Sequence, residues 1–180
     1  RNELYKTETV LSYQIKAIES TIMNNPTVEK FLAKEGLTAL NLNSPKQMST
    51  LLYDYFKVPV TKEGKTTKHD VLVQINEKIQ NPFIDTLLEY RGLSKLKDTY
   101  IQGIKEALDR SDSDRIHVTY HQTAAITGRL SCSKPNLQTI PKSVDNAKII
   151  RSMFVSRPGY TLVEMDFKQL EFRCISGNSR

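Results

Sequence analysis

Apolar residues recur at helical spacing through the first 110 positions of the chain. A first stripe predicts an amphipathic helix up to a break at residues 24–26, and it consists of Leu11, Ile15, Ile18 and Ile22. A short helix is predicted over Val28 to Lys34, because Gly36 follows it as a typical helix end. The beginning of the chain is therefore expected to be helical.

A second helix start stands at residues 44–47, where Ser44 can cap the helix and Gln47 can complete a capping box. Its buried stripe is predicted to consist of Met48, Leu51, Leu52 and Tyr55. Residues 60–69 are polar and contain Gly64, which predicts a mobile basic loop. A further short helix is predicted by the spacing of Val71, Ile75 and Ile79.

The longest helical pattern runs from Pro82 to about Leu108, although Gly92 and Gly103 lie within it. Its apolar positions are Phe83, Leu87, Leu93, Leu96, Tyr100, Ile104 and Leu108. The run Ser111-Asp112-Ser113-Asp114 then indicates a linker. We place a domain boundary near residue 114, between a first unit of residues 1–114 and a second of residues 115–180.

Beyond this linker the apolar residues alternate with polar ones, so strands replace helices in the prediction. Residues 116–120 and 149–155 predict short strands, and an extended loop is expected over residues 123–148. Tyr160 to Met165 predicts a buried strand with Asp166 at its end, and a helix is expected from about Lys168. The predicted fold class is therefore α+β.

Composition narrows the classes of function without selecting one. The 180 residues carry a formal net charge of +6 and a pI near 9.2, which is compatible with an anionic partner such as nucleic acid. The sequence contains no run of 18 apolar residues, so no membrane span is predicted. Cys132 and Cys174 are too few for a disulfide framework or a zinc site, so we expect a reducing cytoplasm. Both ends of the chain are interpreted as cuts in a longer protein.

Asp166 is the candidate for chemistry, because a carboxylate at a strand end is well placed to hold a hard cation. Phosphoryl transfer with two metal ions uses such carboxylates to hold Mg²⁺ at the attacking and leaving oxygens. The alternative is an aspartate that only caps the turn between strand and helix. The residues by themselves leave both interpretations open.

Four segments of the chain resemble motifs of the bacterial DNA polymerase I type, family A. Residues 166–173, DFKQLEFR, are similar to its motif A, DYSQIELR. Residues 127–141, TGRLSCSKPNLQTIP, resemble TGRLSSxxPNLQNIP, with Tyr120-His121-Gln122 upstream as in the family's YHQ. Residues 88–100, LEYRGLSKLKDTY, resemble the thumb helix LEYRGLAKLKSTY. The motifs follow the family's order and together cover roughly residues 40 to 180.

The resemblance implies a helical thumb over residues 1–114, followed by the first antiparallel strands of a palm that is incomplete here. It implies that Asp166 binds both Mg²⁺ ions and that Phe167 contributes its backbone carbonyl. Glu171 takes the place of the family glutamate that excludes a ribonucleotide 2′-hydroxyl, which favours dNTPs as substrates. The alternative for Glu171 is a solvated helix residue.

The implied partner is primer-template DNA. Arg129, Asn136 and Gln138 match residues that contact the duplex near the primer end, where minor-groove acceptors occur on every base pair; alone, Asn136 and Gln138 would be loop residues. Arg91 and Lys95 share a helix face that the family thumb turns to DNA, or else form a solvated basic face. Three lysines match the family's thumb tip, namely Lys62, Lys65 and Lys68. They either bind phosphates of the DNA backbone or only make the protein more soluble. The matches with supporting roles are His121, Arg151, Gln169 and Arg173.

Departures from the motifs suggest a divergent member, and a viral one would act in the host cytoplasm. Phe167 replaces the usual Tyr, Lys168 replaces a small Ser beside Asp166, Cys132 replaces a Ser, and Ser143 stands where many members carry Arg. A second palm carboxylate and the fingers helix are missing from these residues. We expect the 180 residues to be monomeric and unable to polymerise alone.

Three other classes of function are weighed against a polymerase. One is a non-catalytic nucleic-acid-binding remnant, which a continuation of the reading frame would distinguish. Another is a single-subunit RNA polymerase or other palm enzyme, which Glu171 opposes. A metal nuclease built on Asp166 and Glu171 lacks a third cluster of ligands.

Overall fold

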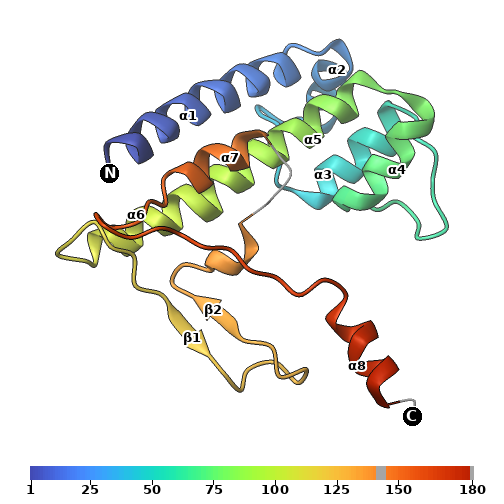
Figure 1. Cartoon of the computed structure of the whole chain (residues 1–180). Helices are drawn as coiled ribbons and strands as arrows, with labels where there is room; N and C mark the ends of the chain where they lie inside the picture. The colour runs from blue at the N-terminus through green and yellow to red at the C-terminus, as the bar shows by residue number, and fades with distance from the viewer. Residues whose placement is uncertain (141–144, 179–180) are drawn as a thin grey trace.

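A long helical rod organises the structure, a computed structural model that describes residues 1–140 and 145–178. The rod consists of α5 (Pro82–Lys95), the π-helical segment η2 (Leu96–Ile101) and α6 (Gln102–Asp109). Helix α1 (Asn2–Met23) lies along it and contacts α5 and η2 (Figure 1). The predicted rod is confirmed, and the glycines at 92 and 103 do not break it.

The core lies between α1 and the rod. Leu4, Leu11, Ile15 and Ile22 are buried on α1, as the first apolar stripe predicts for the last three. Facing side chains of the rod, among them Leu87 and Ile101, are fully buried. Lys105 and Glu8 add a half-buried ion pair of 2.9 Å between α6 and α1. The apolar stripe of the rod therefore holds α1 alongside it along most of its length.

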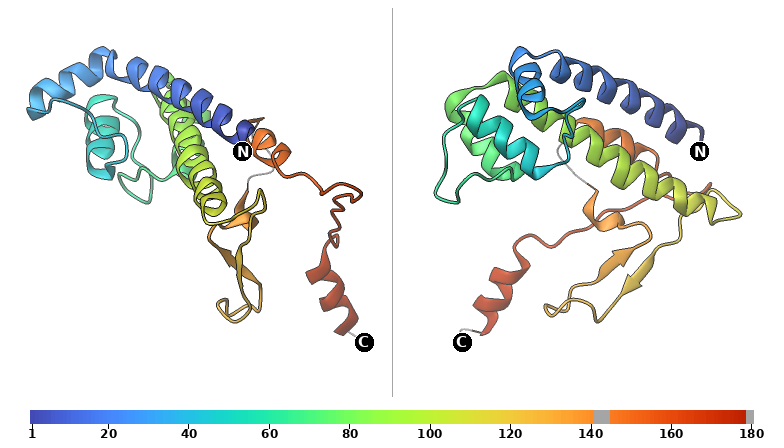
Figure 2. Two further views of the ribbon diagram at one scale, coloured as in Figure 1. Left: turned by 90° about the vertical axis from the view of Figure 1, so that its left-hand side faces the viewer. Right: turned by 180° about the vertical axis from the view of Figure 1, so that it is seen from behind.

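A cluster of short helices caps the far end of the rod (Figure 2). It contains α2 (Pro26–Glu35), α3 (Pro45–Thr50), the π-helical turn η1 (Leu51–Tyr55) and α4 (His69–Ile79). Gly36 ends α2 in a left-handed conformation, φ 65°, and its N–H donates to the Leu32 carbonyl. These helices confirm the predicted ones at nearly the expected bounds.

Two local predictions about this cluster are wrong. Ser44 does accept from the Gln47 N–H, but the Gln47 side chain accepts from the Asn41 N–H and no capping box closes. Tyr53 is buried where Tyr55 was expected, because the π-helical turn shifts the buried face. The side chains of Leu51, Leu52 and Tyr53 are consequently buried in succession.

A β-hairpin follows the C-terminal end of the rod. Strand β1 (Thr119–His121) pairs antiparallel with β2 (Ser131–Ser133), with Tyr120 opposite Cys132. The 3₁₀ turn η3 (Leu137–Thr139) follows, and its Thr139 carbonyl accepts a 2.6 Å hydrogen bond from Tyr100 Oη on the rod. The predicted strand at 116–120 is thus displaced by a few residues, and β2 and η3 lie in the stretch expected to be loop.

Two predicted strands are absent from the described structure. The segment expected as a strand at 149–155 begins in helix α7 (Asp145–Ser152), whose Ile150 is fully buried and which contacts η2. Residues 161–167 form neither helix nor strand, and the side chains of Leu162 and Met165 are 67% and 90% exposed. A strand requires a neighbour for its backbone groups, and this segment has none among the described residues.

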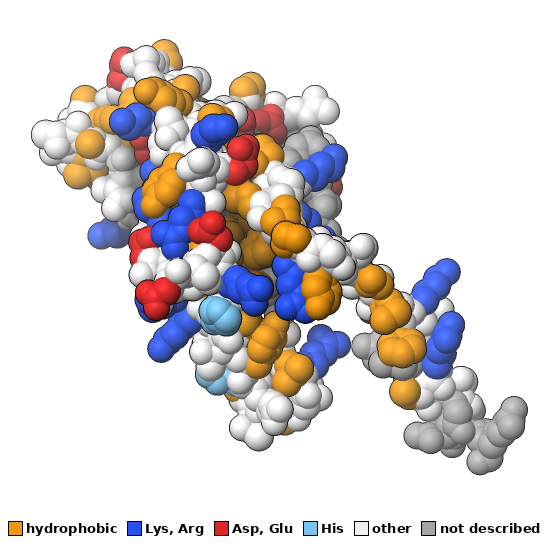
Figure 3. Space-filling view, turned by 60° about the vertical axis from the view of Figure 1, so that its left-hand side comes forward, with side chains coloured by type: hydrophobic (Ala, Val, Ile, Leu, Met, Phe, Trp, Pro, Cys, Tyr) orange, Lys and Arg blue, Asp and Glu red, His pale blue; other side chains and the backbone are white. Residues whose placement is uncertain are grey.

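The C-terminal arm leaves the body of the molecule and ends in α8 (Leu170–Asn178), as Figures 1 and 3 show. A mostly helical architecture with a two-stranded antiparallel sheet confirms the α+β class. Within the described ranges, no helix combines the length and the apolar character that crossing a membrane requires. A domain boundary at residue 114 stays a prediction.

Replacing Ile150 by Ala is expected to destabilise the chain by about 2–5 kcal/mol, because buried methylenes are lost and a cavity remains. Ile149→Ala is the matched control, since Ile149 is 40% exposed on the same helix and its truncation should cost less than about 1 kcal/mol. Urea unfolding followed by circular dichroism measures both changes. Equal effects of the two variants would contradict the docking of α7 on the rod.

Candidate nucleic-acid interface

The basic loop, residues 60–68, connects η1 to α4 and carries Lys62, Lys65 and Lys68 on its surface. Gly64 sits in a turn at φ 84°, and its N–H donates to the Thr61 carbonyl. Lys65 pairs with Asp54, and Lys68 lies 3.2 Å from Glu63. Exposed ion pairs of this kind are worth little, so both lysines can exchange their carboxylates for phosphates.

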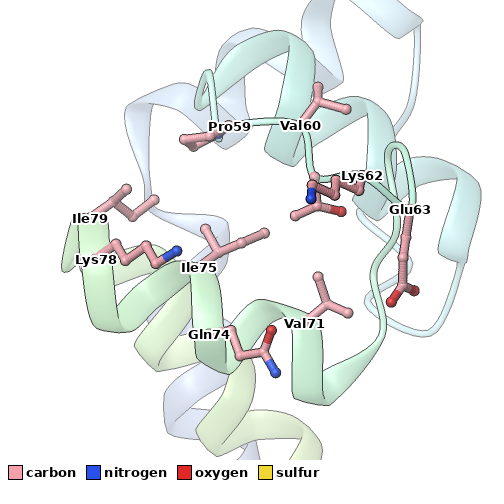
Figure 4. A pocket seen from close by; sticks show the side chains of 10 residues that line it. Pro59, Val60, Lys62, Glu63, Val71, Gln74, Ile75, Lys78 and Ile79 are labelled. Atoms are coloured by element: carbon pink, nitrogen blue, oxygen red, sulfur yellow. The ribbon is translucent and has the colours of Figure 1, made fainter.

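A cleft of about 550 Å³ opens between the first half of the basic loop and α4 (Figure 4). Its apolar lining comes from Pro59 and Val60 on one side and from Val71, Ile75 and Ile79 on the other. Lys62 and Lys78 add cations to the lining. The loop is therefore not packed flat on α4, and the first half of the loop stands away from the helix.

Arg91 and Lys95 share a face of α5, as their spacing predicts, but their surroundings differ. Lys95 is exposed, whereas Arg91 is half-buried and its Nη1 donates to the Thr67 carbonyl at 2.6 Å. Burial lowers the pKa of the Arg91 guanidinium, although an arginine still stays charged at physiological pH. The Arg91 side chain is thus neither a freely solvated cation nor an open ligand for phosphate.

The hairpin carries the next group of predicted residues. Arg129 is exposed and follows Gly128, which has φ 73° in the connection between the strands. His121 Nε2 lies 2.9 Å from Ser133 Oγ, so this side chain links the two strands.

Arg151 does not belong to the hairpin. It is exposed in the last turn of α7.

Asn136 and Gln138 lie at the turn η3 that follows the hairpin. The Asn136 side-chain oxygen accepts from the Gln138 N–H at 3.1 Å, so Asn136 caps the turn, and both side chains are exposed. The hydrogen bond from Tyr100 to the Thr139 carbonyl ties this turn to the rod. Sequence reasoning placed Tyr100 only on the apolar stripe, since nothing in its spacing signals the partner of its hydroxyl.

Asp166 lies in the C-terminal arm, away from the hairpin. Its side chain is exposed, as are those of Phe167 and Lys168. Gln169 adopts φ 55° in the turn before α8, and its carbonyl accepts from the Arg173 N–H at 3.2 Å. The expected place of Asp166 at the tip of a strand is wrong here, because residues 161–165 before it form neither helix nor strand.

Two sequence-based interpretations fall outside the description. Glu171 belongs to α8 by its backbone, but its side chain is not among the described ones. Ser143 lies in the undescribed range 141–144.

The described residues by themselves do not complete a two-ion metal site. Mg²⁺ prefers oxygen ligands, and two-ion sites share carboxylates from several chain segments. No group of three or more His, Cys, Asp or Glu side chains comes together within the described part of the chain. Asp166 therefore offers a single carboxylate ligand.

Comparison with known proteins gives consistent matches over the whole chain. The family described as DNA polymerase family A matches residues 2–180. DNA polymerase I of Caldicellulosiruptor bescii is 39% identical over 164 residues, which is 89% of this chain and 19% of that protein. The thermostable DNA polymerase I of Thermus thermophilus is 40% identical over 139 residues, 76% of this chain and 17% of that protein.

A solved structure agrees with these relatives. The POL domain of Pol1 from M. smegmatis, in complex with DNA primer-template and dNTP, superposes with a TM-score of 0.73 at 34% identity. The match covers 89% of this chain and 26% of that one. The chain spans about a fifth of the length of the curated relatives named above. On the family match over residues 2–180 and these identities, the chain belongs to DNA polymerase family A.

Proposed function

We propose that these residues belong to an enzyme of template-directed DNA synthesis and that they grip the primer-template duplex. Membership of the family supports the activity, and the M. smegmatis relative is described in complex with DNA primer-template and dNTP. Residues 1–114 would form the thumb and residues 115–180 the beginning of the palm.

The observation that carries the proposal is the exposure of the matched motif side chains on a hairpin tied to the rod. Arg129 and Gln138 are exposed, and Tyr100 ties the turn η3, which carries Gln138, to the rod. A guanidinium or carboxamide held in this way can donate to the acceptors that every base pair shows in the minor groove. Such contacts test pairing geometry without reading sequence, as a template-directed enzyme requires.

The basic loop would add affinity that does not depend on sequence. Lys62, Lys65 and Lys68 are exposed on it, and Lys95 is exposed on the rod. Each phosphate neutralised by such a cation releases counterions from the duplex. Contacts to phosphates fix the position of the protein on DNA, while the hairpin contacts the base edges.

The chemistry of the complete enzyme would use Asp166 as one ligand of a pair of Mg²⁺ ions, together with the Phe167 carbonyl. The Glu171 side chain would occupy the space that the 2′-hydroxyl of a ribonucleotide needs, which would favour dNTPs. Gln169 and Arg173 would support this motif. The remaining ligands would come from outside the described residues, because these offer no carboxylate cluster.

The second candidate is a nucleic-acid-binding remnant without catalysis. It is favoured by one observation, the exposure of Leu162, Val163 and Met165 in the segment before Asp166, where the structure shows no strand. Reading the coding sequence beyond residue 180 distinguishes the two candidates, since a fingers motif and a second palm carboxylate are expected only for the enzyme.

The 180-residue chain is expected to bind a primed duplex with an affinity that falls as salt rises. Replacing Lys62, Lys65 and Lys68 together by Gln should lower the slope of log K against log salt by up to about 2.7, at about 0.9 per phosphate contact. Fluorescence anisotropy over a salt series measures this slope. Lys30→Gln on α2 is the control, and an unchanged slope in the triple variant would refute the role of the loop.

Arg129→Ala should weaken duplex binding about tenfold to a hundredfold, because a charged hydrogen bond is worth about 1.5–3 kcal/mol. The loss should be equal for duplexes of different sequence, since the acceptors of the minor groove recur at every base pair. Anisotropy with two unrelated primed duplexes checks this. A loss confined to one sequence would contradict minor-groove contact at the primer end.

The chain alone is expected not to extend a primer, since one carboxylate cannot hold two metal ions. The measurement is incorporation of dNTPs on a primed template with Mg²⁺, with the Thermus thermophilus enzyme as the positive control. Clear incorporation by the 180 residues would refute this expectation.

A further inference from the structure

Three consecutive carbonyls in the second half of the basic loop accept hydrogen bonds from side chains of three other elements. Ser49 Oγ on α3 donates to the Lys65 carbonyl at 3.2 Å. Tyr53 Oη on η1 donates to the Thr66 carbonyl at 2.7 Å. Arg91 Nη1 on α5 donates to the Thr67 carbonyl at 2.6 Å. We call these three hydrogen bonds the carbonyl clamp.

Burial makes the Arg91 contact more than an incidental surface hydrogen bond. The side chain is half-buried, and no carboxylate forms an ion pair with it within the described ranges. A buried cation is costly unless polar groups satisfy it, and the Thr67 carbonyl supplies such a group. Burial of the Tyr53 ring likewise raises the pKa of its hydroxyl, so the hydroxyl keeps its proton and donates.

The clamp fixes only one half of the basic loop. Residues 65–67 are held against α3, η1 and α5, whereas residues 59–63 border the cleft above α4. Without the clamp, the lysines of the loop would sample many positions, and ordering each backbone residue costs about 1–2 kcal/mol. A fixed second half lets Lys65 and Lys68 keep their spacing before any partner binds.

We propose that Arg91 is a positioning residue, which holds the second half of the basic loop so that Lys65 and Lys68 are presented together to the phosphates of a duplex. That the partner is a DNA duplex rests on the proposed function. The carbonyl clamp does not depend on it. The clamp gives Arg91 a role through the loop backbone rather than through a direct phosphate contact, since one of its five N–H donors serves the Thr67 carbonyl.

The clamp is tested without DNA by amide hydrogen exchange of residues 61–68. Arg91→Met and the nearly isosteric Tyr53→Phe should each speed exchange in this loop by about tenfold or more. Arg110→Met is the matched control, since Arg110 also donates to a backbone carbonyl, that of Lys134, but at the other end of the rod. Unchanged exchange in both clamp variants would overturn the proposal.

Positioning is separated from direct contact by a double-mutant comparison of duplex affinity. Arg91→Met should weaken binding in the native chain and have no further effect when Lys62, Lys65 and Lys68 are already Gln. A direct phosphate contact predicts the opposite, namely the same loss in both backgrounds and a salt slope lower by about 0.9. That result would overturn the positioning role.

Arg91→Lys separates geometry from charge. The ammonium keeps the charge but lacks the planar fork of donors, so exchange should accelerate and affinity should fall as in Arg91→Met. Native affinity in Arg91→Lys would show that charge alone matters and would refute the proposal. If the triple lysine variant binds as tightly as the native chain, the DNA role of the loop fails, while faster exchange in Arg91→Met still establishes the clamp.

Discussion

The apolar side of the rod formed by α5, η2 and α6 is the surface on which the other packed parts of the chain depend. Helix α1 covers one length of it, the cluster of short helices covers its far end, and α7 covers η2. A single helix cannot bury its own stripe, so each of these contacts exchanges water for apolar neighbours. Tyr100 ties the turn η3, which carries Gln138 and follows the hairpin, to the rod.

π-helical segments occur where the helices make these contacts. In η1 the extra residue lets Leu51, Leu52 and Tyr53 be buried in succession, and Tyr53 then reaches the basic loop. In η2 it brings Tyr100 to the Thr139 carbonyl. Such insertions change which face of a helix meets its neighbour, and they are frequent at functional sites. The π-helical segments therefore determine which side chains reach the basic loop and the turn η3, and both of these belong to the proposed DNA surface.

The proposed DNA surface has one part with a fixed backbone and another part whose ion pairs can exchange partners. Side chains on the hairpin and at η3 are exposed on backbone that is itself fastened, which suits contacts to base edges. The lysines of the basic loop pair weakly with Asp54 and Glu63, which suits phosphates that exchange with carboxylates. The C-terminal arm, by contrast, exposes Leu162, Val163 and Met165.

Local patterns in the sequence determined the helical half of the protein, its caps at Ser44 and Gly36, and the motif residues of the candidate site. Spacing of 3.6 residues and turn chemistry act within a few positions, so they can be read without the fold. Tertiary structure decided that residues 145–152 are a helix, that the segment before Asp166 does not form the expected strand, and that Arg91 holds a loop carbonyl. Strand pairing and long hydrogen bonds join residues far apart in the chain, and only the packed rod determines which of them meet.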